Sequence, residues 1–119
     1  MNSVLVVDDE TMVLMLVKAA LTKANFNVDT AGAGDEAIRK FNTGTYDLVI
    51  TDICMPGTDG NHVVHHIRKS TKHTTPVVGI SGTPWLLNNT EFDTVLPKPF
   101  TIKSLLDTAK SLTNQASDC

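Results

Sequence analysis

The chain has 119 residues, the length of one ordinary domain, and its 41% hydrophobic and 19% charged residues give a net charge of −3. This balance argues against direct nucleic-acid binding, because phosphate contacts need clustered lysine and arginine. No apolar run is long enough to insert into a membrane, and the N-terminus, MNSVLVVDDE, lacks the layout of a signal peptide. The two cysteines, Cys54 and Cys119, give no disulfide framework. We therefore expect a single domain over residues 1–119 in a reducing, cytoplasmic setting.

Apolar patterning predicts that strands and helices alternate along the chain. In order, we expect a strand at 4–7, a helix at 11–24, a strand at 25–31, a helix at 33–41, a strand at 46–51, a helix at 62–69, strands at 76–80 and 94–97, and a helix at 102–112 capped by Thr101. The last residues, NQASDC, are expected to fray. Alternating strands and helices indicate a parallel sheet. Continuous Val/Ile/Leu strands indicate helices on both faces, so the fold class is α/β, a three-layer, doubly wound, five-stranded parallel sheet.

Reactive side chains follow the predicted strands, at the edge where doubly wound sheets bind ligands. In chain order they are Asp8, Asp9, Glu10, Asp52, Ser81 and Lys98. A turn-forming role accounts for a single acid such as Asp8, but it is a poor account of the whole set on four strand ends. We expect these groups to converge on one rim of the sheet.

The predicted cluster of carboxylates indicates a metal site. Neighbouring carboxylates repel each other, and a bound cation relieves that repulsion. Oxygen-only ligands favour Mg²⁺ or Mn²⁺, which typically bridge carboxylates to phosphoryl oxygens. A phosphoryl group would also use an amine and a hydroxyl donor, here Lys98 and Ser81. Asp52, the most central acid in the sheet, is the best-placed nucleophile.

Four motifs together closely resemble the receiver domain of two-component response regulators. They are VLVVDDE (4–10), YDLVITDICMPGTDG (46–60), PVVGISG (76–82) and LPKPF (96–100). The motifs occur in the family's order and span nearly the whole chain. The resemblance implies the flavodoxin-like strand order 2-1-3-4-5.

The resemblance also implies a role for each matched acid. Asp52 would be the phosphoacceptor. Asp9 would bind Mg²⁺ directly and Asp8 largely through water. Cys54 would offer its backbone carbonyl, not its thiol, as a further metal ligand.

The remaining matched residues would serve the phosphoryl group. Ser81 would be the hydroxyl that moves toward that group in the switched state. Lys98 would pair with a phosphoryl oxygen, and with Asp52 beforehand, and the Lys98–Pro99 bond is commonly cis in this family. The implied protein is a phosphorylation-dependent switch that turns over no diffusible substrate. Its partners would be a sensor histidine kinase or histidine phosphotransfer protein and an unknown downstream protein.

Two features depart from the family pattern. The aromatic residue that usually takes part in switching is replaced by Val95, and Phe92 is a candidate substitute, although a structural role is favoured for it. The stretch GTPWLLNNTEFD (82–93) leaves room for one or two helical turns, so the family's fourth helix is expected to be short or missing. Trp85 in this stretch is either a core side chain or an exposed contact.

Helix 11–24 suggests a further partner-binding surface. At about 100° per residue, Val17 and Leu21 lie on the core side, whereas Met15 and Met12 point away from it. Exposed methionines make adaptable binding surfaces, and kinases and phosphotransfer proteins of this family dock beside this helix.

Alternative functions remain open. The chain could be a receiver-like interaction module that is never phosphorylated or that switches atypically. An aspartyl-phosphate phosphatase of the haloacid-dehalogenase type would need a second aspartate where Cys54 stands. A mononucleotide binder would need a Gly/Ser/Thr-rich first loop instead of DDE. His62 and His66 have a spacing that could chelate zinc, but a solvated helix face is favoured. The chain is either a stand-alone receiver or one domain of a longer regulator or hybrid kinase.

Overall fold

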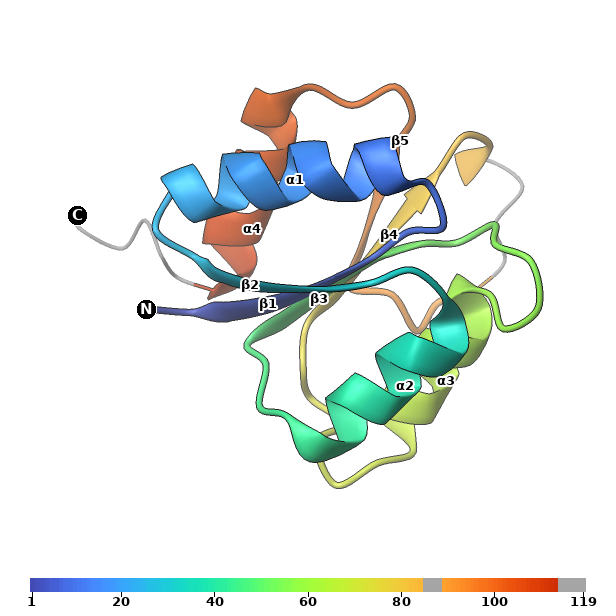
Figure 1. Ribbon diagram of the computed structural model, residues 1–119. Helices are drawn as coiled ribbons and strands as arrows, with labels where there is room; N and C mark the ends of the chain where they lie inside the picture. The colour runs from blue at the N-terminus through green and yellow to red at the C-terminus, as the bar shows by residue number, and fades with distance from the viewer. Residues whose placement is uncertain (85–88, 114–119) are drawn as a thin grey trace.

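The computed structural model describes residues 1–84 and 89–113. In chain order its elements are β1 (Ser3–Val7), α1 (Thr11–Lys23), β2 (Asn27–Ala31), α2 (Gly34–Thr43), β3 (Leu48–Asp52), α3 (Gly60–Arg68), β4 (Val77–Ser81), β5 (Thr94–Pro97) and α4 (Ile102–Thr113). The strands form one parallel sheet in the order β2-β1-β3-β4-β5, which confirms the order implied by the resemblance (Figure 1).

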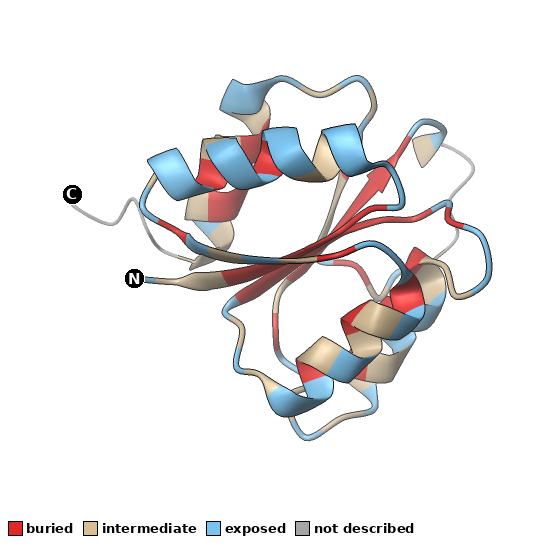
Figure 2. Ribbon diagram, viewed as in Figure 1, coloured by how far each residue is buried: buried red, intermediate tan, exposed pale blue. Residues whose placement is uncertain are grey.

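The sheet is the middle of three layers. Helices α1 and α4 cover one face, and α2 and α3 cover the other (Figure 1). Side chains of β1 alternate between the two sides: Val4 and Val6 pack toward α1 and α4, whereas Leu5 and Val7 pack toward α2 and α3. Because helices cover both faces, the central strands are buried at nearly every position (Figure 2), and most of their residues are apolar.

The connection between β4 and β5 is short, as expected. Within its described residues there is no α-helix, and Pro84 lies in a 3₁₀ turn. Trp85 lies outside the described residues, as does the C-terminal segment that was expected to fray. Phe92 is a buried core residue whose ring, like the Ile53 side chain, would meet a Cβ placed on Gly79. The structural role favoured for Phe92 is therefore confirmed.

Two helices begin at side-chain caps. Asp59 precedes α3 and accepts a hydrogen bond from the His62 backbone N–H at 3.1 Å. Thr101 precedes α4, and its hydroxyl accepts from the Ser104 N–H at 3.0 Å, while the Ser104 hydroxyl accepts from the Thr101 N–H. No helix in residues 1–84 or 89–113 is long and apolar enough to cross a membrane.

Candidate functional site

The strand register brings the predicted site residues to one edge of the sheet. Asp52 pairs with Ile80 across β3 and β4, and Ser81 pairs with Pro97 across β4 and β5. The carboxyl ends of these strands therefore lie together at one edge of the sheet.

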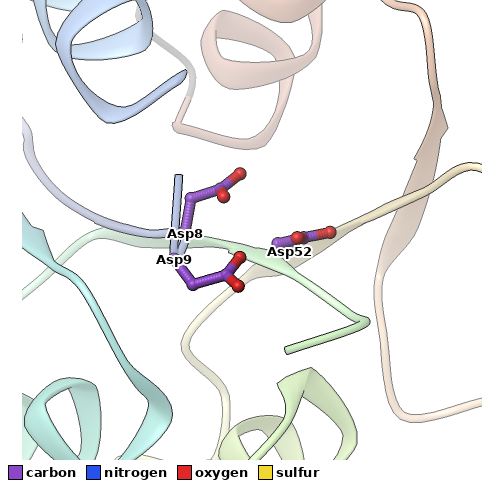
Figure 3. Close-up of side chains that lie close together, drawn as sticks. All are labelled: Asp8, Asp9 and Asp52. Atoms are coloured by element: carbon purple, nitrogen blue, oxygen red, sulfur yellow. The ribbon is translucent and has the colours of Figure 1, made fainter. Parts of the chain in front are cut away.

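Three carboxylates form a compact cluster at this edge (Figure 3). One carboxylate oxygen each from Asp8, Asp9 and Asp52 lies within 4.8 Å of the others. Asp8 and Asp52 are buried, at 1% and 4% exposure, and Asp9 is exposed. Burial raises the pKa of Asp8 to about 6, and burial also raises the pKa of Asp52 against the attraction of Lys98. The folded chain thus holds Asp8 and Asp52 in an environment that disfavours their charge.

The two carboxylate oxygens of Asp8 differ in their hydrogen bonding. Its Oδ1 accepts a hydrogen bond from the Glu10 N–H at 2.9 Å. Its buried Oδ2 has no hydrogen-bond partner among the residues that the structure describes. A buried polar atom without a partner is costly, and a cation beside it would remove that cost.

Lys98 is the cation that faces this cluster. Its Nζ lies 3.3 Å from Asp52 Oδ1 and 4.0 Å from Glu10 Oε1. Burial lowers the pKa of Lys98, but Asp52 and the other nearby carboxylates outweigh burial, so the net shift is upward. One lysine shared among several carboxylates neutralises only part of their charge.

Ser81 lies beside Lys98 at the end of β4. The Lys98 backbone N–H donates to the Ser81 carbonyl at 2.8 Å, and the Thr83 N–H donates to the Ser81 hydroxyl oxygen at 3.0 Å. The hydroxyl hydrogen of Ser81 stays available to another acceptor. The Lys98–Pro99 bond is cis, as the resemblance implied.

The loop after Asp52 is packed closely against α3. The Gly60 N–H donates to the Ile53 carbonyl at 2.9 Å. A Cβ on Gly60 would lie 2.6 Å from the Asp52 carbonyl oxygen, so the first turn of α3 rests directly on the Asp52 backbone. Cys54 is exposed in this loop.

The outer side of α1 is apolar and exposed near the acidic cluster. Met12 and Met15 are 80% and 64% exposed, as predicted, and Leu16, which the sequence analysis missed, is 55% exposed. Leu16 follows Met12 by one helical turn, so the same spacing argument could have found it. A groove of about 470 Å³ is lined by Glu10, Val13, Leu16, Lys98, Pro99, Phe100 and Ile102. The apolar surface of α1 therefore continues to Lys98.

Three further residues from the sequence analysis lie away from this cluster. Val95 pairs with Gly79 and packs, half-buried, against the core on the side of α2 and α3. His62 Nδ1 lies 2.8 Å from Asp59 Oδ1, whereas His66 Nε2 lies 2.7 Å from Asn42 Oδ1. The two histidines thus contact different partners, as expected for a polar helix face.

Comparison with known proteins identifies the family and the fold. The sequence-family model of the response regulator receiver domain matches residues 4–110. The chain belongs to this family. Among curated relatives, the receiver is 35% identical over 121 residues to the transcriptional regulatory protein ResD of Bacillus subtilis, covering 98% of this chain and 50% of ResD. It is 32% identical to the regulatory protein VanRB of Enterococcus faecalis, covering 92% and 51%. The chain spans about half the length of these relatives.

Solved structures match the receiver over nearly its whole length. The response regulator TrrA of Thermotoga maritima, in complex with Mg²⁺–BeF, aligns with a TM-score of 0.86 and 36% identity, covering 94% of this chain and 99% of TrrA. The chemotaxis response regulator CheY4 of Vibrio cholerae aligns with a TM-score of 0.86 and 29% identity, covering 94% and 98%. This receiver therefore has the CheY-like architecture of two-component response regulators.

Proposed function

We propose that this receiver accepts a phosphoryl group on Asp52 from a phosphohistidine of a sensor histidine kinase or histidine phosphotransfer protein, and that phosphorylation changes its protein-binding surface. One observation carries the proposal. Asp52 is buried, its carboxylate is clustered with those of Asp8 and Asp9, and the Lys98 amine lies 3.3 Å from it. This is the charge arrangement that phosphoryl transfer to a carboxylate needs.

The residues present fit a Mg²⁺ ion. The unpartnered, buried Oδ2 of Asp8 and the all-oxygen cluster favour a hard divalent cation, with Mn²⁺ as a substitute. Asp8, Asp9 and Asp52 would hold it, with the Cys54 carbonyl as an additional ligand. When bound, the ion would neutralise charge on the phosphoryl oxygens. The Mg²⁺–BeF complex of TrrA supports this assignment.

The chain's own residues divide the chemistry among them. A carboxylate oxygen of Asp52 forms the bond to phosphorus as the phosphorus–nitrogen bond of the donor histidine breaks. The Lys98 ammonium donates a hydrogen bond to a phosphoryl oxygen, and the Ser81 hydroxyl donates another while it still accepts from Thr83. The added charge of about −1.5 to −2 draws Ser81 toward the site. The reaction modifies the receiver itself, so no turnover of a diffusible substrate is expected.

Labelling with acetyl phosphate in Mg²⁺ tests the phosphoacceptor. Asp52→Asn removes the nucleophile, and we expect it to abolish phosphate incorporation measured by intact-protein mass spectrometry. Asp47→Asn is a matched control at the opposite end of β3, where the carboxylate accepts from the Ser3 N–H, and it should label like the wild type. Full labelling of the Asp52 variant at another residue would contradict the assignment.

The phosphodonor is proposed to dock on the outer face of α1. Met12, Met15 and Leu16 form an exposed apolar surface that continues through the groove to Lys98. A helix that carries the donor histidine must approach this edge to reach Asp52, so the surface suits an apolar helix of the donor. Trp85, the other predicted contact, lies outside the described residues and stays a prediction.

The environment of Val95 supports a second candidate function, that of a receiver with atypical switching. The side chain is β-branched and packed against the core, so it has no ring to rotate. ResD is by name a transcriptional regulatory protein, and this chain matches only half of its length. The expectation of no direct nucleic-acid partner is therefore proposed for the receiver domain alone.

A further inference from the structure

One face of α3 carries three polar residues that bind the chain just before β5. Asn61, His65 and Arg68 are spaced by four and then three residues, so they lie on the same side of the helix. Each of them has a partner among residues 89–93. We call these three side chains and their contacts the α3 ladder.

The first two contacts of the α3 ladder are single side-chain pairs. Asn89 Nδ2 donates to Asn61 Oδ1 at 2.9 Å, and His65 Nδ1 lies 3.3 Å from both carboxylate oxygens of Glu91. Asn89 also accepts from the Glu91 N–H through its Oδ1, so the two contacts are linked. Each pair is partly exposed and can separate without leaving a buried group unpaired.

The third contact is a fixed anchor. Arg68 donates to the Glu91 carbonyl at 3.0 Å and to Asp93 Oδ2 at 2.7 Å. It also donates to the carbonyls of His73 and Thr75. The guanidinium therefore holds the end of α3 to the start of β5, whereas Asn61 and His65 are free to change partners.

The α3 ladder begins at the phosphoacceptor. Gly60 packs on the Asp52 carbonyl, and Asn61, the first ladder residue, follows it directly. On the core side, Ile53 and Phe92 meet at Gly79, so residues next to Asp52 and next to Glu91 share one packing site. A shift at Asp52 therefore reaches residues 89–93 by two routes, through α3 and through the core.

The other end of the same connection starts at Ser81. The hydroxyl of Ser81 accepts from the Thr83 N–H, so movement of Ser81 displaces the first residues after β4. At the far end of the connection, a hollow of about 550 Å³ lies beside Glu91, Phe92 and Asp93 and gives residues 91–93 space to move. Strand β5 offers no comparable movable side chain at Val95, which is packed against the core.

We propose that the α3 ladder transmits the state of Asp52 and Ser81 to the surface, so that the signal leaves through α3 and residues 89–93 instead of through β5. The inference rests on the proposed phosphorylation of Asp52. In the phosphorylated state the Asn61–Asn89 and His65–Glu91 contacts change, while the Arg68 anchor persists. The surface that changes is then the polar side of α3 together with residues 89–93.

Hydrogen exchange with Mg²⁺ and beryllofluoride, which mimics the phosphoryl group, tests the proposal. The test variant is Asn61→Ala with His65→Ala, and the control is His66→Ala, which removes a neighbouring histidine contact to Asn42 on α2. Without beryllofluoride, the test variant should exchange amides 89–93 roughly two- to tenfold faster, the factor expected for one or two lost hydrogen bonds. With beryllofluoride, the wild type and the control should change at residues 81–83, 60–69 and 89–93. The test variant should still change at 81–83 and 60–69, but its response in 89–93 should be reduced, because only the core route through Ile53 and Phe92 remains.

Each result separates the α3 ladder from the phosphoacceptor assignment. A wild-type response at 81–83 without one at 60–69, or a response centred on β5, overturns the ladder and leaves phosphorylation standing. An undiminished response at 89–93 in the test variant also overturns it. No response anywhere in the wild type, together with no acetyl phosphate labelling, overturns both proposals.

Discussion

At the scale of single residues, the burial of the Asp8 carboxylate has a free-energy cost that the surrounding protein does not offset. Its Oδ2 is buried without a partner among the described residues, and Asp52 faces it with a like charge. Such a cost at a strand end is expected where a site is organised for a ligand instead of for stability. The cost also makes the residue a sensitive probe of the proposed metal.

The substitution Asp8→Asn should stabilise the metal-free protein. Asparagine keeps an oxygen to accept from the Glu10 N–H and replaces the unpartnered oxygen with an amide that can donate to nearby carboxylates. Removing one buried like charge should raise the free energy of unfolding by roughly 1–2 kcal/mol, measured by urea denaturation in EDTA. Asp9→Asn is the matched control, and its gain should be smaller because Asp9 is exposed. A loss of stability in the Asp8 variant would contradict this account of the site.

The positions of the site residues could be predicted because each one lies at or just beyond the carboxyl end of a strand. Side-chain environments could not be predicted in the same way. Sequence order does not distinguish Asp8 from Asp9, yet one is buried and the other exposed. The α3 ladder was also not predicted, because His65 and Glu91 come together only after the short β4–β5 connection has folded back on α3.

At the scale of elements, α1 separates its two faces sharply. Val17 and Leu21 are buried, as predicted, while Met15 is exposed. The helix also has Lys18 and Lys23 and no acidic residue. The outer face therefore suits a donor surface that is apolar with acidic neighbours.

We expect Met15→Glu to weaken phosphotransfer from the cognate donor by about tenfold or more, since it places a charge in an apolar contact. Acetyl phosphate labelling should be unchanged, because Met15 is not part of the acidic cluster. The measurement is the rate of transfer from a phosphorylated kinase or phosphotransfer protein. Thr45→Glu, an exposed position on the α2–β3 connection, is the control for added charge. Equal loss of labelling by both donors would argue against a docking role.

Asp29 on the edge strand β2 contacts side chains of α2 and of the α2–β3 connection. The Tyr46 hydroxyl donates to Asp29 Oδ2 at 2.8 Å, and Lys40 Nζ lies 3.1 Å from Asp29 Oδ1. Burial, with the hydrogen bond to Asp29, raises the pKa of Tyr46 from 10.0 to about 12. The folded state therefore holds the phenol proton more tightly than the unfolded state does.

This shift predicts a specific alkaline effect. The Tyr46 contribution to stability is complete below pH 10 and is lost as pH rises from 10 to about 12. Tyr46→Phe should cost about 1 kcal/mol at neutral pH. The difference between wild type and variant should shrink toward pH 12, as measured by urea denaturation across that range. Tyr46 is the chain's one tyrosine, so a difference that stays constant would sink the interpretation.

Element boundaries differed from the predictions where local backbone geometry intervened. Asn25 adopts φ 71° at the end of α1, so β2 begins at Asn27 instead of residue 25. Asp59 caps α3, so that helix begins at Gly60, two residues earlier than predicted. Apolar periodicity locates the body of an element, but its ends depend on caps and turns that periodicity does not contain.

At the scale of the whole molecule, the pattern of elements predicts a parallel sheet but not its strand order. Several right-handed arrangements of five strands satisfy the same alternation of strands and helices. The order 2-1-3-4-5 followed from the resemblance of four motifs to receivers, and the structure confirms it. This order places β1 and β3 side by side, and thereby brings Asp8 and Asp9 to Asp52.

Because the acidic cluster is assembled by the complete fold, Mg²⁺ should stabilise the whole molecule. A ligand that binds only the folded state raises the free energy of unfolding, by about 2.7 kcal/mol at a hundredfold excess over its Kd. We expect Mg²⁺ to raise the Tm measured by calorimetry, and Asp52→Asn to reduce that rise. Sodium chloride at matched ionic strength controls for screening of the net charge of −3. Equal Tm values in the two salts would show that the cluster does not hold the ion, because a site formed only in the folded chain cannot bind Mg²⁺ without adding to its stability.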